Sequence, residues 1–389
     1  MEFYAFHLMP WPHLPRDYAQ RYETAWVTLP NSIYEPDEGH HLYNRYIDEL
    51  VYAAEAGFDG ICVNEHHQTA YGTMPSPNLI AAMLVQRTRG MRVKIAVLGN
   101  ALPLRDHPLR VAEEIAMLDV ISGGRIISGF VRGIGAEYHT FGLNPAHSRE
   151  RFAEAHDLLV KAWTEPGPFS WDGKQYSFRY VNPWPRPLQK PHPPIWIPSQ
   201  GSGETIDWAA ERGYTYTQTY TPLQQIKPFF DQYRAAAERA GCPATPEQLG
   251  WAVPVYVGET DEQAREEAWP HLDFLNNSLL RMPQHFFFPP NYLTEQSMER
   301  VLSAKRGLSQ RKTWEDVDRA SLAVVGGPDS VLRRLEEAQR LLGFGRLIVF
   351  VHFGSLPADL TRRNIERLAE HVIPRLRPLA AQAAASSPT

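Results

Sequence analysis

An Asn64-Glu65-His66-His67 run contains the residues best suited to moving protons. A neutral histidine can take up or release a proton near pH 7, which suits general acid–base catalysis. Adjacent residues at a strand end point in different directions, so we expect only one of the two histidines to face a site. The alternatives are hydrogen-bonded core histidines, or zinc bound by Glu65, His66 and His67. Because zinc needs three or four converging ligands and no HExxH-like pattern occurs elsewhere, we expect no metal.

A second run, IPSQGSG at 197–203, could bind an anion. Ser199, Gly201 and Ser202 precede an expected helix, whose first turn has backbone N–H groups without partners in the helix. Together with the serine hydroxyls, these groups fit a phosphate monoester. Serine is also a favoured helix N-cap, so an ordinary capped helix start is the alternative.

Glycines occur at the ends of two further expected strands. In Leu98-Gly99-Asn100-Ala101, a glycine beside a small polar residue lets the backbone approach a flat ligand closely. Gly133-Ile134-Gly135, followed by Glu137 and Tyr138, could be only a turn. No third glycine completes a GxGxxG dinucleotide fingerprint there.

Three phenylalanines stand between prolines in PQHFFFPPNY (283–292), far from any expected strand. They could form a lid over an apolar substrate. They could equally be a hydrophobic plug or an oligomer contact.

The elements that must position these residues alternate between strands and helices. Apolar runs predict strands at 3–8, 59–64, 93–99, 125–130, 195–199, 214–219, 250–257 and 346–353. Periodicity and helix-ending glycines predict helices at 41–56, 77–90, 108–121, 148–163, 203–212, 223–240, 260–269, 328–342 and 358–376. Several strands are almost continuously apolar, as in parallel sheets covered on both faces. This series predicts a (β/α)8 TIM barrel with insertions after strands 4 and 7.

A doubly wound sheet is the alternative fold, but it usually carries a glycine-rich fingerprint after the first strand, and HLMPWPHLPR has none. In a TIM barrel the catalytic groups lie at the carboxyl ends of the strands. This rule selects His7, Asn64 to His67, Asn100, Arg132, Ser199 to Ser202, Tyr220 and His352 as candidates.

Composition narrows the function classes. The 389 residues carry a formal net charge of −5, which favours neither nucleic acid nor an anionic membrane surface as a partner. No apolar run reaches the roughly 18 residues of a membrane span, and Met1 to Pro10 lacks the features of a secretion signal. Two cysteines, Cys62 and Cys242, in so long a chain indicate a reducing compartment, so we expect a cytoplasmic protein. We expect one barrel domain over 1–377, with a disordered Ala/Ser/Pro-rich tail at 378–389.

Taken together, these segments resemble the bacterial luciferase-like flavin monooxygenases. The resemblance covers roughly residues 3–375 and is carried by FDGICVNEHH (58–67), by residues 93–143 and by PHPPIWIPSQGSGETIDWAAERG (191–213). Residues 93–143 are the most specific, because HP-x-R-x-A-E-E is followed by Leu-Asp, S-G-G-R, R-G and E-Y-x-x-F-G. The resemblance implies an enzyme that uses reduced FMN and O2, through a flavin C4a-peroxide, to oxygenate a small, hydrophobic organic substrate. A separate NAD(P)H:flavin reductase would supply the reduced FMN.

The resemblance also assigns roles residue by residue. It implies catalysis by His66, with His67 beside it, and a lid formed by the segment 270–320. It implies cofactor binding by Asn64 at the flavin face, Asn100 against the isoalloxazine, Tyr138 against the flavin or its ribityl chain, Ser199, Gly201 and Ser202 near the phosphate, and Arg132 at the same anion.

Two other functions are compatible with the same resemblance. Some relatives bind a deazaflavin and transfer hydride without oxygen, although nothing here demands that cofactor's longer polyanionic tail. A flavin-binding protein without turnover is the other, but His66, His67 and all eight units are present. The resemblance further implies a homodimer, and the net charge of −5 leads us to expect no nucleic-acid or membrane partner.

Overall fold

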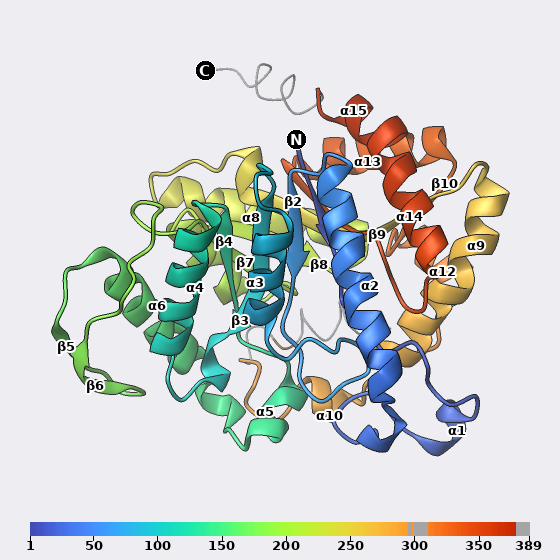
Figure 1. Cartoon of the computed structure of the whole chain (residues 1–389). Helices are drawn as coiled ribbons and strands as arrows, with labels where there is room; N and C mark the ends of the chain where they lie inside the picture. Colours follow the sequence, from blue (N-terminus) through green and yellow to red (C-terminus); the bar gives the residue numbers. More distant parts are fainter. Residues whose placement is uncertain (295–297, 299–309, 379–389) are drawn as a thin grey trace.

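The computed structural model describes residues 1–294, 298 and 310–378, and its centre is a closed barrel of eight parallel strands (Figure 1). The strands are β1 (Glu2–Phe6), β2 (Gly60–Val63), β3 (Lys94–Ala101), β4 (Ile126–Val131), β7 (Ile195–Ser199), β8 (Thr215–Thr219), β9 (Leu249–Val257) and β11 (Arg346–Phe350). Their order is β9-β11-β1-β2-β3-β4-β7-β8, and β8 pairs again with β9 to close the barrel. The predicted TIM barrel is therefore confirmed.

Helices surround the barrel, and each helix predicted from the sequence is present. They are α2 (Pro36–Glu55), α3 (Pro77–Arg87), α4 (Leu109–Ser122), α6 (Ser148–Thr164), α7 (Gly203–Glu211), α8 (Leu223–Arg239), α9 (Asp261–Phe274), α13 (Pro328–Leu342), α14 (Ala358–Arg367) and α15 (Ile373–Leu376). Short helices α1 (Tyr18–Arg21) and α5 (Gly135–Phe141) lie in loops. Helix α2 begins earlier than its periodicity predicts, because Pro36, Asp37 and Glu38 form a favourable polar first turn.

Two insertions interrupt the series after the fourth and seventh barrel strands, as predicted. The first contains an antiparallel hairpin, β5 (Phe169–Asp172) and β6 (Ser177–Val181), that projects from the barrel (Figure 1). The second contains the end of α9, a π turn at Leu275–Leu279, α10 (Gln284–Phe287), α12 (Trp314–Arg319) and β10 (Val324–Gly326), which pairs with β9. Part of the predicted lid and residues 379–389 of the predicted tail lie outside the described residues.

Strands β3 and β4 approach each other so closely that glycine is required on both. A Cβ atom on Gly129 would lie 2.2 Å from the Val97 carbonyl oxygen, and one on Gly99 would lie 2.8 Å from Gly129. The register between the two strands shifts between Val97 and Asn100. This contact fixes the strand ends that lead to Asn100 and Arg132.

The loops that follow the strands gather at one end of the barrel, together with α1, α5 and α10, opposite the N-terminus (Figure 1). Within the described residues, no helix is both long and apolar enough to cross a membrane. The carboxyl ends of the strands are therefore covered by loops and short helices, and the site is found there.

Candidate active site

A cavity of about 230 Å³ lies at the carboxyl ends of the strands. Each barrel strand, or the residue directly after it, contributes to the lining: Phe6, Asn64, Leu98, Phe130, Ile197, Thr217, Ala252 and Ile348. The lining is mostly apolar, with polar groups at a few positions, which is usual for a small-molecule site. His66 and the Ser199 to Ser202 segment, far apart in the sequence, contribute to this same cavity.

The second insertion covers the cavity. Leu280, Met282, Phe287, Phe288, Tyr292 and Leu293 all line it. The segment packs tightly on α5, since a Cβ on Gly135 would lie 2.5 Å from the Phe286 carbonyl oxygen. Two of the three phenylalanines of the FFF motif thus face inward, which fits a cover over the cavity.

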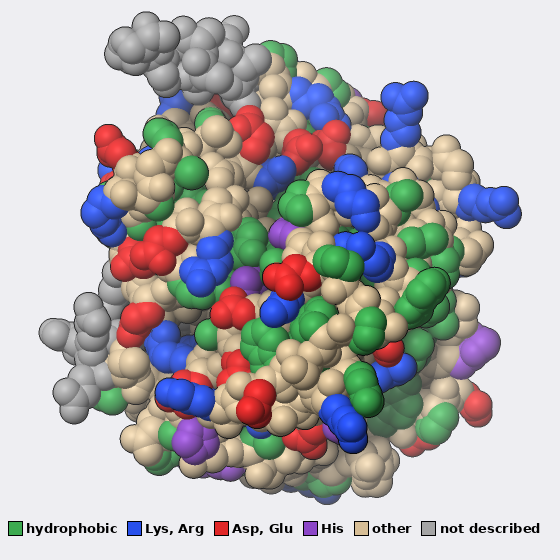
Figure 2. Space-filling model, turned by 90° about the vertical axis from the view of Figure 1, so that its left-hand side faces the viewer, with side chains coloured by type: hydrophobic (Ala, Val, Ile, Leu, Met, Phe, Trp, Pro, Cys, Tyr) green, Lys and Arg blue, Asp and Glu red, His purple; other side chains and the backbone are tan. Residues whose placement is uncertain are grey.

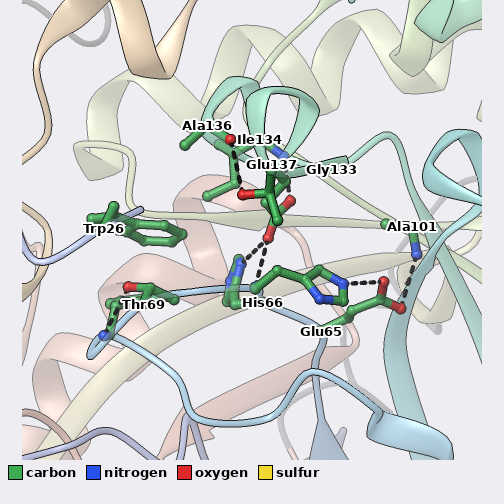
Figure 3. A network of polar contacts seen from close by, with 12 residues as sticks. Trp26, Glu65, His66, Thr69, Ala101, Gly133, Ile134, Ala136 and Glu137 are labelled. Atoms are coloured by element: carbon green, nitrogen blue, oxygen red, sulfur yellow. Dashed lines mark hydrogen bonds and ion pairs between the residues drawn. The ribbon is translucent and has the colours of Figure 1, made fainter. Parts of the chain in front are cut away.

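His66 lines the cavity and is held by a buried carboxylate. Its Nδ1 lies 3.0 Å from Glu137 Oε1, and its ring packs edge-on against Trp26 (Figure 3). A carboxylate can only accept, so Nδ1 carries the proton in this contact. Because Nδ1 is bonded to Glu137 and the side chain is 18% exposed, Nε2 is the nitrogen available to a bound molecule.

Glu137 joins two segments through this one side chain. Its Oε1 also accepts from the His67 backbone N–H at 3.3 Å, and its Oε2 accepts from the Ile134 N–H at 2.7 Å. The residue is 1% exposed. The first turn of α5 is thereby tied to the loop after β2.

His67 pairs with a second carboxylate, Glu65, and does not itself line the cavity. Its Nε2 lies 2.8 Å from Glu65 Oε1, and its ring contacts the edge of Phe141. Glu65 Oε2 accepts from Arg105 at 2.6 Å and from the Ala101 N–H at 3.3 Å. Only one of the two histidines therefore lines the cavity, as the strand-end rule predicts.

Another part of the cavity lining carries a positive charge. Arg132 lines it, donates to Ser148 Oγ at 3.1 Å and lies 4.4 Å above the Tyr292 ring. Ser199, Ser202 and Thr205 line the same part, at the N-terminus of the nine-residue helix α7. Cationic side chains, hydroxyls and a helix N-terminus together favour an anion.

Arg149 strengthens this positive charge from behind Ser202. It donates to Ser202 Oγ at 3.2 Å, and its buried Nε has no hydrogen-bond partner among the described residues. Burial, together with the nearby Arg132, lowers the pKa of Arg149. Glu204 lies 3.5 Å from Arg149 and is 32% exposed on its side chain. Glu204 Oε2 also accepts from Ser202 Oγ at 2.9 Å, so this partly exposed carboxylate contacts both Arg149 and Ser202.

The predicted site residues divide into two groups. Asn64, His66, Arg132, Ser199 and Ser202 line the cavity, whereas His67, Asn100, Tyr138 and Gly201 do not.

The second group supports the first. Asn100 is fully buried and exchanges hydrogen bonds with Asn78. The Tyr138 hydroxyl donates to the Arg132 carbonyl oxygen at 2.5 Å. Gly201 has a φ of +97°, which glycine adopts without strain, and forms the turn between the two serines.

Sequence reasoning did not assign several residues that shape the site. Glu137 was noted only as part of a glycine motif, and Arg149, Trp26 and Tyr71 were not considered. Trp26 and Tyr71 lie in loops without periodicity, so only the aromatic richness of the long loops indicated that such side chains could cover a pocket.

One group of three potential metal ligands exists among the described residues, namely His7, Glu49 and His352. The two histidine rings are stacked, with centroids 4.5 Å apart and planes 13° apart. A metal ion lies in the plane of each imidazole that binds it, so one ion cannot serve both rings as they stand. His7 instead bonds to Glu49 at 2.9 Å and accepts from the Met9 N–H.

Comparison with known proteins gives consistent matches along the chain. The sequence model described as luciferase-like monooxygenase matches residues 25–344. Protein y4wF of Sinorhizobium fredii is 31% identical over 332 residues, which cover 83% of this chain and 90% of that protein. The oxygenase component of flavin-dependent trigonelline monooxygenase from Acinetobacter baylyi is 24% identical over 86% of this chain and 89% of its own length. The crystal structure of monooxygenase RslO1 from Streptomyces bottropensis superposes with a TM-score of 0.73 at 26% identity, covering 96% of this chain and 99% of that one.

Replacing Glu137 with Gln tests whether this carboxylate holds His66. A carboxamide cannot accept at both oxygen positions, so one buried N–H loses its acceptor, and we expect unfolding to become easier by about 1–3 kcal/mol. We also expect the His66 ring to move toward the tautomer protonated at Nε2, which ¹⁵N NMR of the histidine side chains reports directly.

Glu337→Gln is the matched control, because Glu337 is exposed and lies 3.7 Å from Arg333. Its expected change is below about 0.5 kcal/mol. Equal stability of the two variants, with an unchanged His66 tautomer, would show that Glu137 does not hold the ring.

Proposed function

This chain belongs to the luciferase-like monooxygenase family, and on that premise we propose that it is the oxygenase of a two-component flavin system. It binds reduced FMN delivered by a separate NAD(P)H-dependent flavin reductase and uses O2 to oxygenate a small organic substrate. The observation that carries the proposal is that a carboxylate-held histidine and an arginine–serine anion site line the same cavity. The relative from Acinetobacter baylyi is named as an oxygenase component, which supports a separate reductase and oxygenase.

The residues that line the cavity fit both the phosphate and the ring of FMN. Arg132, Ser199, Ser202 and Thr205 would hold the phosphate, with Arg149 adding positive charge behind Ser202. Asn64 lines the cavity, and its buried Oδ1 accepts no hydrogen bond from the described residues. A flavin ring has an imide N–H that such an oxygen could accept.

When bound, reduced FMN would supply the two electrons with which O2 is activated. The chain's own residues would supply position, a proton and a dry environment. His66 Nε2 would exchange a proton with the reacting molecules, while Glu137 keeps Nδ1 protonated. The cover formed by Phe287, Phe288 and Leu280 would exclude water.

We propose that the site residues outside the cavity act by positioning the others. Tyr138 would orient the backbone at Arg132, and Gly201 would set the turn between Ser199 and Ser202. His67 would fix the loop after β2 through Glu65. Asn100 would hold the end of β3 through Asn78.

The proposed function is tested by reconstitution. The chain, FMN, NADH, a flavin reductase and ¹⁸O2 are incubated with a panel of aldehydes, ketones and sulfonates. We expect at least one product that carries one ¹⁸O atom and that requires the reductase. Absence of any labelled product, together with no binding of reduced FMN, would refute the proposal.

His66→Asn in the same assay should lower product formation by about 10²–10⁴-fold, the usual loss for a proton-transfer group. More of the NADH consumed should then appear as hydrogen peroxide. His371→Asn is the control, since His371 is 51% exposed and outside the cavity. An unchanged product yield in His66→Asn would remove His66 from the reaction.

The anion site is tested by comparing FMN with riboflavin, which lacks the phosphate. Losing a charged hydrogen bond costs about 1.5–3 kcal/mol, so Arg132→Met should raise the FMN dissociation constant by about 10- to 100-fold. Ser202→Ala should raise it less, and neither should alter riboflavin binding. Fluorescence titration measures both, with Arg340→Met on the exposed face of α13 as the control. Equal effects on the two flavins would argue against a phosphate at this site.

We further propose that two chains pair through α3 and α4. The large hydrophobic side chains there are 45–64% exposed, namely Leu79, Met83, Met117, Val120 and Ile121. In Figure 1, α3 and α4 lie side by side at the front of the molecule. Figure 2 is turned so that this front lies on the right, and hydrophobic side chains gather toward that edge. Exposed apolar patches of this kind commonly mark interfaces.

Light scattering should give twice the chain mass of 44.3 kDa. Met117→Lys combined with Ile121→Lys should give the monomer mass, because two lysines cannot be buried against an apolar partner. Tyr180→Lys, on the exposed hairpin, should leave the dimer intact. A monomeric wild-type chain would contradict the pairing.

A further inference from the structure

One wall of the cavity is built almost entirely of aromatic rings. Trp26 and Tyr71 are stacked, with centroids 5.1 Å apart, and both line the cavity. Tyr220 packs edge-on against Phe350 at 5.4 Å, and Phe350 against Phe6 at 4.7 Å. His66 contacts the edges of both Trp26 and Tyr71, so this wall borders the residue proposed to move the proton.

This wall has no unpaired charge. The ionisable groups lining the described cavity, tyrosines apart, are Arg132, Glu65, Glu137 and His66. Glu65 is paired with Arg105 and His67, and Glu137 with His66. Arg132 contacts Ser148 and Tyr292 at the anion site. An anionic group placed against the aromatic wall would therefore lose its hydration without gaining a partner.

The wall is held in place by contacts from outside the barrel. Trp26 Nε1 donates to the Leu279 carbonyl oxygen at 2.9 Å, and Thr24 Oγ1 donates to the Arg281 carbonyl oxygen at 2.7 Å. The loop that carries Trp26 is thus fastened to the end of the second insertion. A rigid aromatic surface binds a flat ring with little loss of conformational entropy.

The backbone conformation of Tyr220 also indicates that the surrounding structure fixes this wall. Its φ is +52°, a left-handed conformation that is rare for a bulky residue. Such conformations persist where the surrounding structure imposes them, and they concentrate at ligand sites. Here the conformation brings the Tyr220 hydroxyl 2.8 Å from that of Tyr71.

The two phenols form the polar feature of this wall. Tyr71 donates to Tyr220, which leaves the lone pairs of the Tyr71 oxygen as acceptors. Burial raises the pKa of both hydroxyls, so both stay protonated at any physiological pH. A substrate hydroxyl that reaches the pair can donate to the Tyr71 oxygen.

We propose that Trp26, Tyr71, Tyr220, Phe350 and Phe6 form the substrate subsite, and that it selects a flat ring system that carries a hydroxyl group and no anionic group. This inference rests on the proposed function, because it places the substrate beside His66 in the same cavity. It excludes a flexible chain as the preferred substrate, since a chain gains less from stacked ring faces. The subsite is separate from the anion site that would hold the FMN phosphate.

Three neutral probes of ten carbons each separate ring from hydroxyl: 2-naphthol, naphthalene and 1-decanol. Equilibrium dialysis against the full chain should give the tightest binding for 2-naphthol. Losing one neutral hydrogen bond costs about 0.5–1.5 kcal/mol, so naphthalene should bind about 3- to 10-fold more weakly. We expect 1-decanol to bind at least about 10-fold more weakly than 2-naphthol. Tightest binding of 1-decanol would overturn the ring selection, and equal binding of the two aromatic probes would overturn the hydroxyl selection.

Substitutions in the aromatic wall test whether the probes bind there. Tyr71→Phe should remove the advantage of 2-naphthol over naphthalene, and Trp26→Leu should weaken both probes. Tyr180→Phe, on an exposed strand of the hairpin, is the matched control. Circular dichroism checks folding, and Tyr71→Phe still decides the matter if Trp26→Leu does not fold. Unchanged selectivity in Tyr71→Phe would overturn the proposal.

Added FMN distinguishes this proposal from the proposed function. Saturating FMN should leave 2-naphthol bound within about twofold, because the two ligands occupy different parts of the cavity. Displacement of 2-naphthol by FMN would show that the aromatic wall belongs to the flavin site, which overturns the subsite. If FMN itself fails to bind in the same dialysis experiment, the flavin assignment fails, while the measured selectivity among the three probes still stands.

Discussion

The Glu137 carboxylate is the contact on which the site depends. It accepts from the His66 ring, the His67 backbone and the Ile134 backbone, and so ties the loop after β2 to the first turn of α5. A buried carboxylate that lost these donors would carry a large desolvation cost. The hydrogen bonds that stabilise the buried Glu137 charge therefore include the one that orients the His66 ring. The position of the cover over the cavity also depends on this contact, because the covering insertion packs on α5.

The cavity lining contains two chemically different regions. One region has Arg132, Ser199 and Ser202 at a helix N-terminus, and the wall near His66 has aromatic rings. The proposed FMN would be oriented by its phosphate at the anion site, with its ring reaching His66. The aromatic wall would then present a second flat molecule to the same histidine. Binding energy from both contacts would thus fix the geometry of the reacting groups, which lowers the barrier.

Much of the fold could be predicted from local patterns, because eight apolar strands alternate with periodic helices. The strand-end rule selected His66, Arg132 and Ser202 for the same reason. Glu137 could not be assigned, since its bond to His66 joins residues 71 positions apart. Asn100 shows another limit. The register shift in β3 leaves Leu98 lining the cavity while the Asn100 side chain bonds to Asn78, and a bulge of this kind has no sequence signal beyond its glycine.

The central claim is that one FMN molecule reaches from the anion site to His66. The most direct test is FMN titrated into protein labelled with ¹⁵N in its histidine side chains. We predict that the His66 ring resonances shift in step with FMN binding, that those of His371 do not, and that Arg132→Met moves the His66 shift to higher FMN concentration. FMN that binds tightly without altering the His66 resonances would contradict the account.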